Sequence, residues 1–156
     1  MFELSKLCNA YERATSAERA VLLREKSSSI IHVLGNMSIP GISDPIKALA
    51  GFIVGSVAFD GKVNEMEYFI MYPALVHVFG EDFDFASLKR AFRSERDVRK
   101  IVNDYKDKMV SILDFLDDEM KWEVITLCLA VFAVDGKVSL KEKLYIRRLW
   151  SMGTDK

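Results

Sequence analysis

The feature that most constrains the fold is a short segment that occurs twice. Residues 58–67 read Ala-Phe-Asp-Gly-Lys-Val-Asn-Glu-Met-Glu, and residues 133–142 read Ala-Val-Asp-Gly-Lys-Val-Ser-Leu-Lys-Glu. Each copy follows a long apolar segment and precedes an amphipathic one. This pattern indicates a helix–turn–helix unit that is present twice, over 43–80 and 118–152, with the two units related by a pseudo-two-fold axis.

The apolar residues recur at helical spacing, and no stretch alternates with the period of two that is typical of strands. The clearest stripe is Val98, Ile101, Val102, Tyr105, Met109, Ile112, Leu113 and Leu116, with Ser94 as a cap before it. Further helices are predicted over 2–14, 17–34, 45–59, 65–79, 85–93, 118–134 and 140–150. Ser16, Asp84 and Asp117 can cap the helices that follow them, and Pro73 should kink or split the helix in which it lies. We therefore expect a single compact all-α domain over 1–156, in which residues 1–35 form N-terminal helices outside the motif.

The composition sets limits on partners and location. Half of the residues are hydrophobic, which is enough for a core, and 22 Lys+Arg against 23 Asp+Glu leave a net charge of −1. A chain with this charge balance has no overall positive potential that would attract nucleic acid. The apolar runs 48–59 and 124–134 are too short to span a bilayer. With two cysteines and no apolar leader, the sequence predicts a cytoplasmic protein that does not span a membrane.

Most of the repeated motif has an explanation in folding alone. Its glycine can end one helix in a left-handed conformation, and the residue three positions later can cap the next helix. A glutamate three residues after that can reach back to complete a capping box. These residues are Gly61, Asn64 and Glu67 in the first copy and Gly136, Ser139 and Glu142 in the second.

The aspartates of the motif, Asp60 and Asp135, need a separate explanation. Each stands at the carboxyl end of a helix, where the helix dipole disfavours an anion by about 0.3–1 kcal/mol. Loop amides, Lys62 and Lys137, or a bound cation could each compensate for this charge. An EF-hand is excluded, because the first half of its loop would fall on apolar, helical residues.

The long apolar helix, the Asp-Gly-Lys-Val turn, the polar cap and the following glutamate resemble the TerB-like (tellurite resistance) helical family over residues 43–152. The resemblance implies an all-α bacterial protein with no catalytic activity and a role in tellurite or other chemical stress. It also implies that acidic residues bind a divalent metal, which here would be Asp60, Glu67, Asp135 and Glu142. Oxygen-only ligands favour Ca²⁺ or Mg²⁺ over zinc or copper.

Two functional hypotheses of different classes follow. In the first, the chain is a non-catalytic TerB-like stress-response protein that binds a divalent cation at the duplicated turns. In the second, the motifs are purely structural, and the chain is a metal-free helical adaptor that docks a protein partner. A hydrolase using the same carboxylates would need a nucleophile and an oriented base, and the sequence shows no motif that supplies them.

The cation hypothesis makes a prediction about stability. An ion at about 100 times its dissociation constant should stabilise the fold by about 2.7 kcal/mol. The double variant Asp60→Asn, Asp135→Asn should lose that increment and stay folded, because asparagine can accept the same loop hydrogen bonds. Thermal denaturation with EDTA, with millimolar calcium and with millimolar magnesium measures the effect. Equal midpoints in all three conditions would exclude the cation.

Overall fold

The computed structural model describes residues 4–58, 63–94, 96–133, 136–138, 143–144 and 146–147. The helices are α1 (Leu4–Arg13), α2 (Ser16–Gly35), α3 (Pro45–Ala58), α4 (Glu65–Phe79), α5 (Phe85–Ser94), α6 (Val98–Asp114) and α7 (Asp118–Phe132). The all-α prediction is confirmed, and the described residues contain no strand. No helix among them is long and apolar enough to cross a membrane. The helix predicted over 140–150 lies largely outside the described residues.

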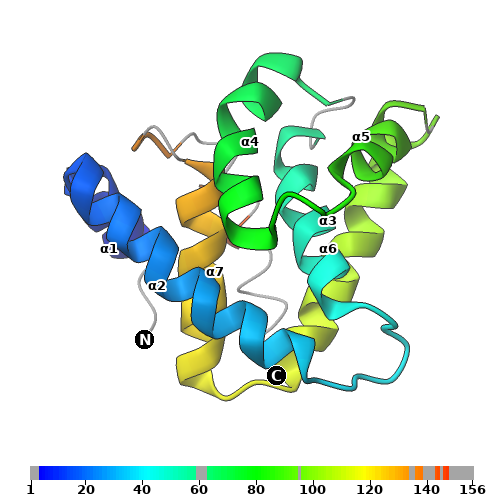
Figure 1. The fold of residues 1–156 in the computed structure, drawn as a ribbon, viewed down its shortest axis with the longest axis horizontal. Helices are drawn as coiled ribbons and strands as arrows, with labels where there is room; N and C mark the ends of the chain where they lie inside the picture. Colours follow the sequence, from blue (N-terminus) through cyan, green and yellow to red (C-terminus); the bar gives the residue numbers. More distant parts are fainter. Residues whose placement is uncertain are drawn as a thin grey trace.

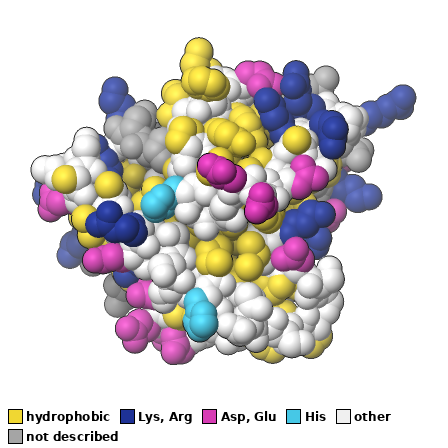
Figure 2. Space-filling model, viewed as in Figure 1, with side chains coloured by type: hydrophobic (Ala, Val, Ile, Leu, Met, Phe, Trp, Pro, Cys, Tyr) yellow, Lys and Arg dark blue, Asp and Glu magenta, His cyan; other side chains and the backbone are white. Residues whose placement is uncertain are grey.

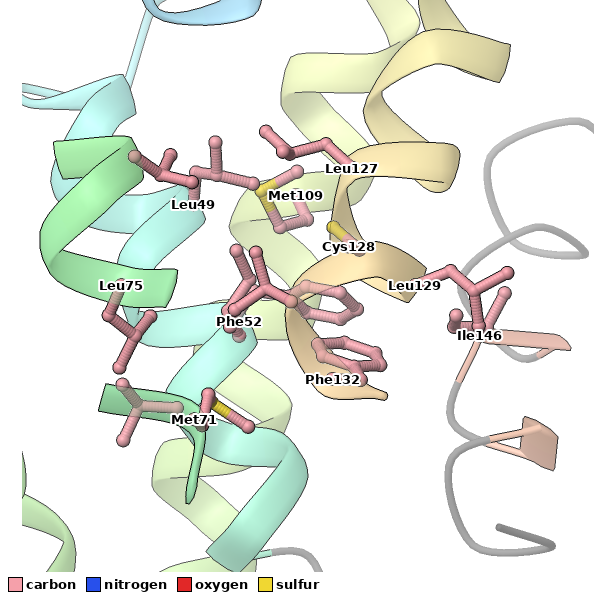
Figure 3. Close-up of a cluster of buried hydrophobic side chains, with 14 of the residues drawn as sticks. Leu49, Phe52, Met71, Leu75, Met109, Leu127, Cys128, Leu129, Phe132 and Ile146 are labelled. Atoms are coloured by element: carbon pink, nitrogen blue, oxygen red, sulfur yellow. The ribbon is translucent and has the colours of Figure 1, made fainter. Parts of the chain in front are cut away.

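The helices α3 and α7 form the centre of the molecule. All residues of α3 from 48 to 58 and of α7 from 124 to 132 are buried, as is expected of helices that are apolar on every side. The two helices meet at Phe52 and Phe132, whose ring centroids are 5.9 Å apart (Figure 3). Side chains of α4 and α6, including Leu75 and Met109, close the core around this pair (Figure 3).

Each central helix is covered mainly by helices from the other half of the sequence. The most extensive contacts between helices join α6 to α3 and α2 to α7. In addition, α5 packs on α3 and α1 packs on α7. Figure 1 shows the result, with α1, α2 and α7 on one side of the molecule and α5 and α6 on the other. The packing is therefore reciprocal: α1 and α2 cover α7, whereas α5 and α6 cover α3.

Two sequence-based cap assignments were wrong. The cap of α2 is Thr15 rather than Ser16, because only Thr15 has a glutamate three residues later, and Thr15 and Glu18 form a complete capping box. The cap of α6 is Asp97 rather than Ser94. The hydroxyl of Ser94 donates instead to a carbonyl within its own helix α5, at 2.7 Å.

Small residues on the central helices admit tyrosines from the covering helices. The spacing of Gly51 and Gly55, echoed by Thr126 and Ala130, predicts that α3 and α7 touch at these residues. This is wrong for Gly51, because a Cβ atom there would lie 2.2 Å from the ring of Tyr105 on α6. The carbonyl oxygen of Ala130 accepts a hydrogen bond from Tyr11 of α1 at 3.1 Å.

The close approach at Gly51 predicts that Gly51→Ala destabilises the protein by about 1–3 kcal/mol, because the methyl group must displace the Tyr105 ring. This loss acts against a gain of up to about 1 kcal/mol in helix propensity. The measurement is urea denaturation. Gly35→Ala is the matched control, since a Cβ there meets only Ile46, at an ordinary 3.7 Å. A Gly51→Ala protein as stable as the unmutated one would contradict the packing argument.

Candidate functional site

The first Asp-Gly-Lys-Val turn is described from Val63 onward. Asn64 caps α4 as predicted, with its side-chain oxygen accepting from the Glu67 N–H at 3.1 Å. The Asn64 N–H, which a full capping box would pair with Glu67, donates to the carbonyl oxygen of Val57 at 3.3 Å. This bond ties the start of α4 to the end of α3. Asp60, by contrast, lies outside the described residues.

The second turn contains the left-handed glycine that the motif predicts. Gly136 has a φ of +84°, which an L-residue rarely adopts. Its position differs from the prediction, because α7 ends at its cap Ala133, three residues earlier. The Gly136 N–H donates to the Ala133 carbonyl oxygen at 2.8 Å, so the glycine closes the turn rather than ending the helix directly.

Helix α1 holds the end of α7 and the turn after it. The buried Tyr11 hydroxyl lies 3.1 Å from the carbonyl oxygen of Ala130 and 2.7 Å from that of Ala133. Past the turn, the Val138 N–H donates to the carboxylate of Glu12 at 3.1 Å. Carbonyls at a helix end lack intrahelical donors, and Tyr11 supplies one. Sequence reasoning missed this role because it placed residues 1–35 outside the motif.

Arg19 of α2 brings a positive charge to the second turn. A Cβ atom on Gly136 would lie 2.5 Å from the Arg19 Cζ, so the guanidinium packs directly on the glycine. Arg19 also donates to the Ala14 carbonyl oxygen and lies over the Tyr11 ring at 5.8 Å. Gly136 directly follows Asp135 in the sequence. A cationic side chain therefore packs on the residue that follows Asp135.

The described residues do not test the predicted metal site. Asp60, Asp135 and Glu142 lie outside the described residues, while Glu67 is half-buried in the first turn of α4. Across the described part of the chain, no group of three or more histidine, cysteine, aspartate or glutamate side chains could hold a metal ion. The shared acidic site stays a prediction.

Helix α4 carries an exposed apolar face. Its outward residues Met66, Phe69 and Ile70 are 69 %, 77 % and 47 % exposed, and Pro73 is also exposed. We call these four residues the α4 stripe, because steps of three and four place them on one helix face. Figure 2 shows hydrophobic side chains gathered over α4, with lysines and arginines to either side. Contiguous exposed apolar surface of this kind marks interaction sites.

Pro73 lies inside α4 without splitting it, in contrast to one of the outcomes predicted from the sequence. Proline has no N–H, so it cannot donate to the carbonyl oxygen of Phe69, four residues earlier. That oxygen therefore lacks its usual helical donor within the exposed stripe. The stripe thus combines apolar side chains with one backbone acceptor.

A groove between α2 and α4 continues the α4 stripe. We call it the α2–α4 groove; its volume is about 370 Å³. It is lined by Tyr11, Ser16, Arg19, Ala20, Leu23, Arg24, Pro73, Ala74, His77 and Ala130. Pro73 belongs to both surfaces, and Ala130 comes from the central helix α7. The lining is mainly apolar, with cationic side chains on α2.

The two flanks of α4 differ in charge compensation. On the α5 side, Glu65 accepts from Lys89 at 2.8 Å and Arg93 at 2.9 Å, and Lys89 holds the pKa of Glu65 below its usual value. On the groove side, neither Arg19 nor Arg24 forms an ion pair with a described carboxylate. Within the described chain, therefore, no ion pair neutralises the arginines that line the groove.

The buried thiol and phenol groups of the core, within the described residues, are unreactive near neutral pH. Cys8 and Cys128 are both buried, and burial raises the pKa of the Cys128 thiol. A neutral, inaccessible thiol is a poor nucleophile, so Cys128 acts as a small side chain of the core. Burial likewise raises the pKa of Tyr68 to about 12. Neither group is suited to acid–base or nucleophilic chemistry near neutral pH.

Comparison with protein-family models, curated proteins and solved structures finds no match for this chain. The resemblance to the TerB-like family therefore stays a prediction that rests on the repeated motif.

The bonds from Tyr11 to the end of α7 predict that Tyr11→Phe destabilises the protein by about 1–3 kcal/mol, because the carbonyl oxygens of Ala130 and Ala133 each lose the hydrogen bond from the Tyr11 hydroxyl. Tyr72→Phe is the control, since the Tyr72 side chain is partly exposed on α4. Urea denaturation of both variants measures the difference. If the two variants lose equally little stability, α1 does not hold the second turn.

Proposed function

We propose that this protein is a non-catalytic helical interaction module that docks a protein partner on the α4 stripe and the α2–α4 groove. The observation that carries the proposal is the exposure of Phe69 and its neighbours on one face of a helix whose opposite face is buried. Side chains that contribute little to folding and are unfavourable in water become useful when a partner covers them. The groove beside the stripe extends that surface to the central helix α7.

The reciprocal packing supports an internal duplication that is larger than the motif. In the proposed arrangement α1–α4 form one half and α5, α6, α7 and the segment after them form the other. In this arrangement α1 corresponds to α5, α2 to α6 and α3 to α7. The contact of α2 with α7 then corresponds to that of α6 with α3, and the contact of α1 with α7 to that of α5 with α3. Residues 1–35 would then be the first part of a repeat rather than an addition to it.

The TerB-like resemblance adds a role in chemical stress and a divalent cation at Asp60, Glu67, Asp135 and Glu142. A Ca²⁺ or Mg²⁺ ion at these four residues is proposed on that resemblance alone. The docking proposal needs no metal.

The docking proposal predicts a position-specific crosslink. A photoreactive benzoylphenylalanine at Phe69 should give an adduct of discrete mass in cells that naturally express the protein. The same analogue at Phe115 is the control, because Phe115 is 56 % exposed at the end of α6, away from α4. Denaturing gels and mass spectrometry report the adducts.

A stability measurement accompanies the crosslink. Phe69→Ser should change the free energy of unfolding by no more than about 0.5 kcal/mol, as for other exposed positions. Leu75→Ala, in the core beneath, should lose about 2–5 kcal/mol. The same adducts at both crosslinking positions, or a Phe69→Ser protein that unfolds, would contradict the assignment of this face to a partner.

A further inference from the structure

We infer that the α2–α4 groove takes an amphipathic α-helix of a partner protein, with carboxylates along one flank of that helix facing Arg19 and Arg24. This inference rests on the proposed docking function and specifies the chemistry of the partner. It follows from the shape of the groove and from its charge.

The walls of the groove are helices, and their lengths suit a helical ligand. The lining of α2 runs from Ser16 to Arg24, and the outer face of α4 runs from Met66 to His77. At 1.5 Å per residue these spans are about 12 Å and 16 Å long, which matches about two to three helical turns. The described chain offers no sheet edge to which an extended peptide could add. The apolar anchors of the ligand would cover the α4 stripe.

The positive charge of the groove predicts that the ligand helix carries acidic side chains along the flank that faces it. Arg19 and Arg24 are the lysine or arginine residues of the lining, and the lining contains no aspartate or glutamate. The Arg24 side chain is exposed, so a ligand can reach it. A carboxylate from the ligand would supply the compensating charge there.

A second copy of this chain fits the same surface less well. A two-fold contact between identical grooves would bring two cationic rims together without a carboxylate from either lining. Like charges across an interface disfavour association. The geometry therefore points to a different protein with the opposite charge.

The test uses two synthetic, fluorescein-labelled peptides of about 16 residues. Both carry leucines at helical spacing on one face; one has glutamates along the flank and the other has glutamines at the same positions. Fluorescence anisotropy with the full chain measures their affinities. We expect the glutamate peptide to bind about 10-fold tighter than the glutamine peptide, with the difference shrinking as salt is added.

Two charge-reversal variants identify the flank. Arg24→Glu should weaken the glutamate peptide by about 10-fold or more and leave the glutamine peptide within about 2-fold. Arg99→Glu makes the same charge change on α6, outside the groove, and should alter neither peptide. Arg24 is used because Arg19 also packs on Gly136, so that its replacement would disturb the second turn.

The outcomes separate this inference from the docking function. Equal affinity for both peptides, with binding lost in Phe69→Ser, would overturn the acidic flank and leave the docking surface in place. If neither peptide binds, the inference that the groove binds a helix is wrong. If the Phe69 crosslink is also missing, the proposed docking function is wrong as well. If sedimentation instead shows a dimer that Phe69→Ser dissociates, the occupant is a second copy and the inference is wrong.

Discussion

The central helices depend on the rest of the chain, because α3 from residue 48 to 58 and α7 from residue 124 to 132 are buried on every side. Each becomes a buried element only when helices from the other half of the sequence cover it, as α6 covers α3 and α2 covers α7. The helices fit closely at these contacts because a large side chain on one helix lies against a small residue on the other, as the Tyr105 ring lies against Gly51. Secondary structure in this chain is therefore local, but its stability depends on contacts between distant segments.

The same dependence explains how much of the fold could be predicted from the sequence. Helical periodicity and cap chemistry act within a few residues, so the spans of the helices and the caps Asn64 and Asp117 were predictable. The partner of Gly51 was not, because small-residue spacing shows that something approaches closely but not what approaches. The choice between Thr15 and Ser16 depended on one glutamate at the right distance.

The candidate site shows the same limit. The left-handed Gly136 was predictable, because a positive φ is a local need that glycine meets. Tyr11 and Arg19, which hold the turn around that glycine, lie more than 100 residues earlier, and no local pattern links them to it. The α4 stripe was hidden for a different reason. Apolar residues surround α4, so the sequence could not show which of its faces the core leaves uncovered.

Arg19 connects the two halves of the functional argument. Its guanidinium packs on Gly136 of the second turn, and the same side chain lines the α2–α4 groove. A contact that draws Arg19 toward the groove must weaken its packing on the glycine, and a change in the turn must alter the charge that the groove presents. Two sites that share one side chain are linked in free energy, and the linkage acts equally in both directions. The second turn and the proposed docking surface therefore share Arg19, and α2 is the element common to both.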